Sequence, residues 1–173
     1  MLFRSDSNNF TVATLQRKIL TRSSLSVFLV NKESELQDNA DSSENSYNRV
    51  GGIDFNLASS DNLWKGKAFF HQAIYKNAGD KAFAAATSIK YNTGTVSAHM
   101  GYSFVGTDFQ ADVGFVKRNG FHRFGSDFEY KYYPEKGNII NHGPTFKFFN
   151  VLDGDLNTTD RELELKYIIN RVD

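Results

Sequence analysis

The sequence predicts an all-β fold, an antiparallel up-and-down meander of about ten long strands that forms a transmembrane β-barrel or part of a larger one. From Val96 to Phe104 every second residue is apolar, and small or polar residues lie between them. Strand side chains point alternately to opposite faces, so this segment has one apolar and one polar face. The pattern recurs along most of the chain in segments of about ten residues separated by turn residues, which is typical of membrane-spanning barrels.

Length and composition exclude several classes of protein. The 173 residues fit one domain, a single β-barrel segment over 1–173, and the 20 basic and 20 acidic residues give no sign of a nucleic-acid partner. The absence of cysteine excludes disulfides, thiolate metal sites and a cysteine nucleophile. The mean hydropathy of −0.47 argues against helical membrane spans, and no run approaches ~18 apolar residues. This hydropathy is compatible with a membrane-spanning β-barrel, because half of the residues in each strand can be polar.

Alternation and turn residues together predict the individual strands. We expect them at 9–20, 24–33, 47–59, 62–77, 80–92, 95–106, 108–118, 121–134, 138–152 and 157–171. Several of the connections between them contain Asn and Gly, which tolerate the positive φ of tight hairpins. Strands joined by such short links are antiparallel neighbours, which predicts a meander.

One connection, 33–48, is long and acidic. It contains Glu33, Glu35, Asp38, Asp41 and Glu44 without a basic residue. We expect a mobile, solvated loop, either the extracellular loop of an outer-membrane barrel or an ordinary surface loop. The first residues contain no apolar secretory segment and the last four contain no aromatic residue. We therefore expect the sequence to be a fragment of a longer chain, cut at both ends.

Alternation fits both a membrane barrel and a soluble ligand-binding barrel, in which the apolar face would point inward. Strands of about ten to fourteen residues favour the membrane barrel, since soluble strands usually have about five or six. Aromatic residues near the expected strand ends are typical of interfacial girdles; these are Tyr91, Phe104, Phe109, Phe121, Tyr132 and Tyr133.

The membrane interpretation assigns each face of the strands. Ala98, Met100, Tyr102, Phe128 and Tyr130 would meet lipid. The polar residues expected to line the lumen are Lys65, Lys67, His71, Ser97, His99, Arg123, Asp127, Glu129, Lys131, Glu162 and Glu164.

Three segments resemble an uncharacterised family of Bacteroidota outer-membrane proteins. They are Asn9-Phe10-Thr11-Val12 through Arg17-Lys18-Ile19-Leu20-Thr21-Arg22-Ser23-Ser24, Val50-Gly51-Gly52-Ile53-Asp54, and Phe109-Gln110-Ala111-Asp112-Val113-Gly114-Phe115-Val116-Lys117-Arg118. In that family a secreted chain begins with a domain similar to a family-9 carbohydrate-binding module and continues into a large barrel-like domain of unknown function. The resemblance implies a bacterial outer-membrane location. It transfers no sugar-binding or catalytic residue to this chain, and members labelled as membrane-associated hydrolases owe that label mainly to the front domain.

One cluster is a candidate for calcium binding. Asp153, Asp155 and Asn157, with Glu164 further on, match most ligand positions of a calcium loop. The loop glycine is replaced by Thr158, so a polar hairpin turn is the favoured interpretation. The histidines, His71 and His99 among them, lack the spacing of zinc ligands.

The sequence therefore predicts a non-enzymatic outer-membrane segment with a structural or transport role and no cofactor. Its partners would be the lipid bilayer, the remaining strands of the parent barrel and, through an upstream domain, glycans. One alternative is a membrane-associated carbohydrate-active hydrolase that uses carboxylates such as Asp127 and Glu162 as an acid–base pair. The soluble ligand-binding barrel is the other.

Overall fold

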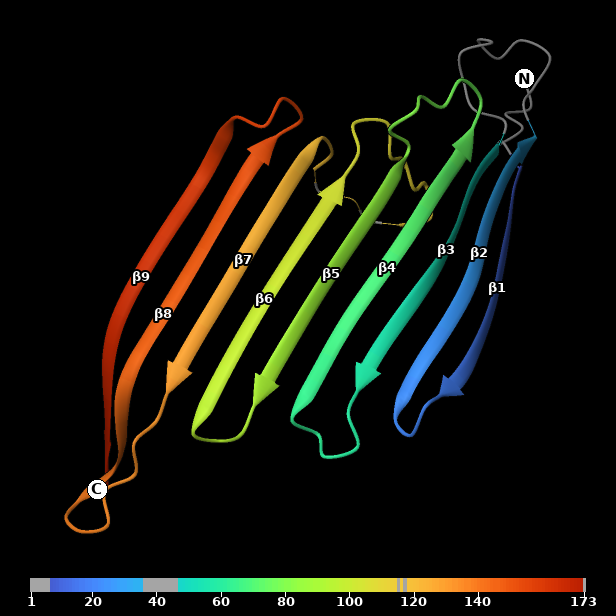
Figure 1. The fold of residues 1–173 in the computed structure, drawn as a ribbon. Coiled ribbons are helices and arrows are strands. Elements are labelled where there is room, and N and C mark those ends of the chain that lie inside the picture. The colour runs from blue at the N-terminus through green and yellow to red at the C-terminus, as the bar shows by residue number, and fades with distance from the viewer. Residues whose placement is uncertain (1–6, 36–46, 115, 117, 173) are drawn as a thin grey trace, which may run out of the picture.

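The described part of the chain forms one sheet of nine strands arranged in sequence order (Figure 1). The computed structural model describes residues 7–35, 47–114, 116 and 118–172. The strands are β1 (Ser7–Ile19), β2 (Ser23–Glu35), β3 (Tyr47–Ala58), β4 (Trp64–Tyr75), β5 (Phe83–Asn92), β6 (Val96–Val105), β7 (Phe121–Tyr130), β8 (Ile139–Asp153) and β9 (Thr158–Arg171). Every neighbouring pair is antiparallel, which confirms the predicted all-β meander. No helix in the described part of the chain is long and apolar enough to cross a membrane.

The expected strand at 108–118 is wrong. None of its described residues belongs to a strand, and β6 pairs directly with β7 from Val96 opposite Tyr130 to Val105 opposite Phe121. Because β6 is already paired with β5 on its other side, the segment has no free strand edge beside it. It forms an irregular connection instead.

The acidic connection is shorter than expected at both ends. Residues 33–35 continue β2 and residues 47–48 begin β3. Glu33 lies 2.8 Å from Arg49 across this hairpin, measured between Oε1 and Nη2. The expected mobile loop, including Asp38, Asp41 and Glu44, otherwise lies outside the described residues.

The sheet has two chemically different faces. Directly opposed residues of neighbouring strands share a face, so the register assigns each side chain. We call the face that carries Met100 the apolar face and the face that carries His99 the polar face. The middle of the apolar face consists mainly of Leu25, Val27, Leu29, Ile53, Phe55, Leu57, Ala68, Phe70, Ala85, Ile89, Ala98, Met100, Tyr102, Phe124, Phe128, Phe146, Phe148, Leu163 and Leu165.

Charged residues on the apolar face lie within three positions of a strand end. Among the described side chains they are Arg17, Glu33, Arg49, Arg161 and Arg171. Many of the apolar side chains are nevertheless exposed; Met100 is 52% accessible and Leu165 is 72% accessible. Exposed apolar area of this extent is typical of surfaces that other molecules or a membrane cover.

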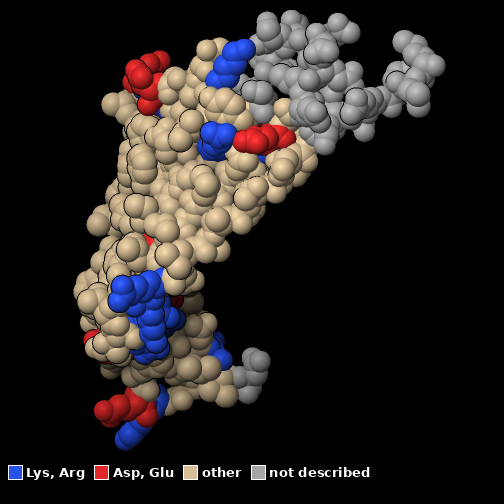
Figure 2. Space-filling view, turned by 90° about the vertical axis from the view of Figure 1, so that its right-hand side faces the viewer, with Lys and Arg blue, Asp and Glu red and all other residues tan. Residues whose placement is uncertain are grey.

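The sheet is curved, and its hollow side is the polar face. Figure 2 views the sheet from the β1 side and shows the hollow on the right, with the visible charged side chains concentrated toward the two ends. One hollow is lined by residues of the β6–β7 connection and by polar-face residues from β4 through β9, including Phe69, Arg123 and Asp160. The apolar face is therefore the convex one.

Fully buried apolar residues gather at one end of the sheet. They are Val50, Ala73, Ala82, Ala84 and Phe109. Phe109 belongs to the connection between β6 and β7, which lies behind the strands in Figure 1 and so covers part of the polar face. The connection begins at Gly106, where a Cβ atom would lie 1.8 Å from the carbonyl oxygen of Lys81. Only glycine permits this close approach.

Candidate functional site

The residues expected to line a lumen all lie on the polar face. Lys65, Lys67 and His71 alternate along β4, while Arg123, Asp127 and Glu129 do so along β7 and Lys131 follows in the same alternation. His99 is opposite Asp127. Glu162 and Glu164 lie opposite Phe149 and Lys147 on the same face of β8.

One row of opposed residues crosses five strands, and basic and acidic residues alternate in it from His99 to Glu164. It runs from Lys90 on β5 through His99, Asp127 and Lys147 to Glu164 on β9, and we call it the charge row. His99 Nδ1 lies 2.9 Å from Asp127 Oδ1, and Lys147 Nζ lies 3.8 Å from Glu164 Oε1. Opposite charges on neighbouring strands attract, so the row supports this strand order.

Several carboxylates of this face have a basic side chain beside them. Lys131 Nζ lies 3.2 Å from Glu129 Oε2, and Glu164 also accepts a hydrogen bond from Lys166. His71 Nε2 is 3.2 Å from Asp54 Oδ1. The polar face therefore carries both signs of charge close together.

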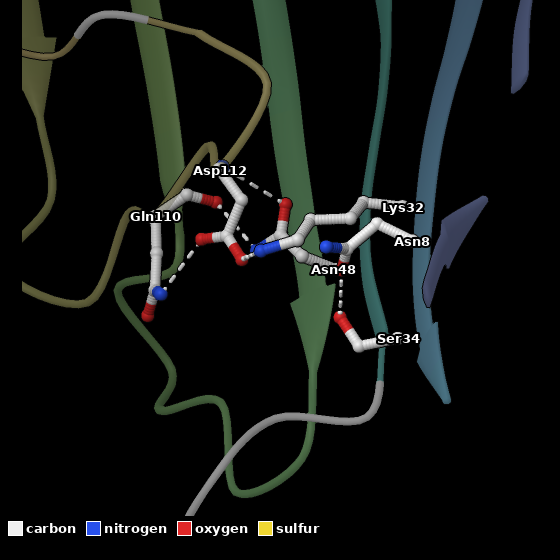
Figure 3. Close-up of polar contacts among 6 residues, drawn as sticks. All are labelled: Asn8, Lys32, Ser34, Asn48, Gln110 and Asp112. Atoms are coloured by element: carbon white, nitrogen blue, oxygen red, sulfur yellow. Dashed lines mark hydrogen bonds and ion pairs between the residues drawn. The ribbon is translucent and has the colours of Figure 1, made fainter. Parts of the chain in front are cut away.

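The connection between β6 and β7 folds onto the polar face, and we call it the inner loop (described residues 106–114, 116 and 118–120). Figure 3 shows its anchor. Asn48, 2% exposed, donates from Nδ2 to the carbonyl of Gln110 at 3.1 Å and accepts from the amide of Asp112 at 3.3 Å. Lys32 Nζ lies 2.9 Å from Asp112 Oδ2, and the Tyr75 hydroxyl donates to the carbonyl of Asp108 at 2.6 Å. Three strands thus hold one loop.

A pocket of about 550 Å³ lies between the inner loop and the sheet. Phe109 and Val116 of the inner loop contribute to it, together with Phe69, Phe121 and Phe149 on the strands. Its ionisable residues are His71, Arg118, Arg123 and Asp160. An apolar wall with a few charged groups is the usual make-up of a small-molecule site.

The structure does not bring the metal candidates together. Asp153 Oδ1 accepts the amides of Asp155 and Asn157 at 3.0 and 2.9 Å, which closes the β8–β9 turn. Glu164 lies opposite Lys147, six residues along β8 from Asp153, a span of about 20 Å. His71 and His99 share the polar face but pair with separate aspartates. Among the described residues no group of three or more His, Asp or Glu side chains is placed to hold a metal ion.

Aromatic residues lie at both ends of the apolar face, and others lie in its middle. Trp64 and Tyr91 lie at one end with ring centroids 4.7 Å apart, and Phe104 packs against His122 at 4.7 Å near the other. Two of the aromatic residues expected in girdles at the strand ends lie elsewhere. Phe109 belongs to the inner loop and is only 5% exposed, and Phe121 lines the pocket on the polar face.

The anchor residues of the inner loop were not anticipated from the sequence. Asn48 and Tyr75 lie at strand ends, where Asn and Tyr are unremarkable, and their partners are 62 and 33 residues away. The one available signal was Phe109, an aromatic residue in a segment rich in Asp, Asn and Gly.

Comparison with known proteins gives no match. No family model, no curated protein and no solved structure is similar to this chain.

Proposed function

We propose that this chain is a segment of a membrane-spanning β-barrel of the bacterial outer membrane, with a structural or transport role and no enzymatic one. The convex apolar face would contact lipid, and the concave polar face would line an aqueous lumen. The observation that carries the proposal is the pairing of curvature with chemistry. A soluble barrel would place its apolar face on the concave side, whereas here the concave side carries the charge row.

The dimensions of the apolar face support a bilayer partner. From Val96 to Phe104 on β6, eight steps of about 3.3 Å span roughly 26 Å, or about 20 Å at the ~40° tilt of such strands. Membrane barrels present an apolar band of about 25 Å. Trp64 and Tyr91 at one border of the face suit the headgroup region, where the rings are buried and the polar atoms stay hydrated.

The unpaired edges support assembly with further strands. β1 and β9 each pair on one side only within the described sheet. In a bilayer, unpaired backbone amides and carbonyls cost several kcal/mol each, so a spanning sheet must close. Further strands of a longer chain would close it, which makes those strands the second partner beside lipid.

Labelling of single cysteines tests the proposal. The chain contains no cysteine, so Met100→Cys and His99→Cys can be compared in the intact protein in isolated outer membranes. Position 100 should resist an aqueous maleimide and react with a lipid-phase reagent, and position 99 should do the reverse. Aqueous labelling at position 100 in folded protein would overturn the proposal.

A further inference from the structure

We propose that the pocket beneath the inner loop binds a small amphipathic anion, an aromatic ring that bears a carboxylate. The proposal rests on the proposed transport role and names the class of solute that the polar face would bind. It is argued from the shape, the apolar lining and the uncompensated charge of the pocket.

The apolar part of the pocket fits a ring. Four phenylalanines on four different segments line it: Phe69, Phe109, Phe121 and Phe149. The volume of about 550 Å³ falls within the ~300–1,000 Å³ of small-molecule sites. Aromatic walls favour a flat apolar body, since rings gain from stacked and edge contacts beyond the burial of area.

Most charges in the pocket are already balanced. Arg118 Nη1 lies 3.6 Å from Asp160 Oδ2, and His71 is paired with Asp54. Arg123 is different, because no acidic side chain in the described part of the chain pairs with it. Its guanidinium lies 5.7 Å from the centre of the Phe149 ring. The pocket therefore presents one uncompensated positive charge beside an apolar wall.

The surroundings of Arg123 leave room for an anion. Arg123 also lines a neighbouring hollow with a floor of small residues, among them Ser88, Gly101 and Gly125. On the other side of that hollow lies Lys67, which likewise has no acidic partner among the described residues and has its Nζ 5.9 Å from the centre of the Phe69 ring. A planar guanidinium binds a carboxylate through two parallel hydrogen bonds, so Arg123 is the group that we expect to hold it.

Isothermal titration calorimetry on the intact protein in lipid nanodiscs tests the site, with empty nanodiscs as the blank. The probes are 2-naphthoate and the neutral 2-naphthylmethanol. The wild type should bind 2-naphthoate at least about tenfold more tightly than the alcohol, as expected from a hydrogen-bonded charge pair. Arg123→Gln should abolish this preference, and Arg123→Lys should retain part of it. Phe109→Ala should weaken binding of both probes.

Lys90→Gln is the matched control. Lys90 is a cation on the same face, in the charge row, but it does not line the pocket. Its replacement should leave the preference for 2-naphthoate unchanged. The absence of saturable binding, an equal affinity for both probes, or equal losses in Arg123→Gln and Lys90→Gln would overturn the inference. The same titration can be run in detergent, without a bilayer. A failure of the pocket to bind the probes can therefore be distinguished from a failure of the cysteine labelling, which tests the membrane proposal.

Discussion

Met100 and His99 are consecutive residues of β6, yet they belong to surfaces with opposite requirements. Met100 is 52% accessible on a face whose middle contains no charged side chain among the described residues, while His99 contacts Asp127 at 2.9 Å within the charge row. The middle of the convex face carries mainly apolar side chains, whereas the concave face carries charged side chains, some in ion pairs and others, such as Arg123, without an acidic partner among the described residues. The face of the sheet on which a side chain lies therefore determines its surroundings more than its position along the chain does.

The largest expected effect comes from placing the same charge on each face. A lipid-facing arginine at the midplane of a membrane barrel costs ~2–4 kcal/mol, and a lumen-facing one costs far less. Met100→Arg should therefore lower the folded fraction in lipid vesicles strongly, and His99→Arg only slightly. Heat-dependent mobility on a detergent gel, combined with urea unfolding, measures both. Equal losses from the two variants would remove the distinction between the faces.

The second test compares two regions of the polar face, one that the inner loop covers and one that it does not cover. Asn48→Ala removes both hydrogen bonds that Asn48 makes to the inner loop and leaves the carbonyl of Gln110 and the amide of Asp112 unpaired. Such a loss costs ~1–3 kcal/mol, so hydrogen exchange of the loop amides should accelerate by about 10- to 100-fold.

Asn56→Ala is the control for this test. Asn56 lies on the polar face of the same strand but is exposed and distant from the inner loop. Exchange in the loop should stay at the wild-type rate. Acceleration in this variant as well would mean that the loop responds to β3 as a whole and not to the Asn48 anchor.

The smallest expected effect lies outside both faces, in the β3–β4 turn. Hydrogen bonds from the Ser59 hydroxyl and the Leu63 amide hold the pKa of Asp61 below its ordinary value of 3.8. A lowered pKa adds stability above pH 3.8 that is lost as the pH falls through the pKa of the folded state. Asp61→Asn should thus lower the urea midpoint slightly at pH 6, and the difference from wild type should shrink by pH 3.

The turn at the opposite end of the sheet provides the comparison for Asp61. Asp155 takes part in the β8–β9 turn through its backbone amide. Asp155→Asn should leave the midpoint nearly unchanged at both values of pH. A pH-independent gap between Asp61→Asn and wild type would show that the Asp61 charge contributes nothing.

The strands of this fold could be predicted from the sequence because side chains alternate between two faces both along a strand and across paired strands. From Val96 to Phe104 on β6 the apolar and polar residues separate onto opposite faces, and the structure pairs both sets across neighbouring strands. The segment 108–118 alternates as well, from Phe109 through Ala111 and Val113, and it forms no strand in its described residues. Alternation indicates that a segment has one apolar and one polar side. It does not indicate whether a neighbouring strand has an unpaired edge with which the segment could form a sheet.

The site was less accessible to sequence reasoning for a related reason. The polar residues expected on one face share it because the period of two fixes the face within each strand. The anchor of the inner loop depends instead on contacts such as Lys32 with Asp112, 80 residues apart, and no local pattern encodes such a contact. Arg123 was predicted on the polar face, but its lack of an acidic partner emerges only from the register of β7 against β6 and β8.

The sequential strand order has a consequence for how such a sheet is assembled and for how it evolves. Each strand contacts only the strands before and after it in the described sheet, so hairpins can add one at a time at low loop-closure cost. The inner loop is the exception, since it can dock only once β2, β3 and β4 are in place to supply Lys32, Asn48 and Tyr75. Duplication or loss of a hairpin near β9 would change the circumference of the sheet and leave this anchor intact. Gene rearrangement can thereby change the number of strands while the anchor of the inner loop on β2, β3 and β4 is inherited unchanged.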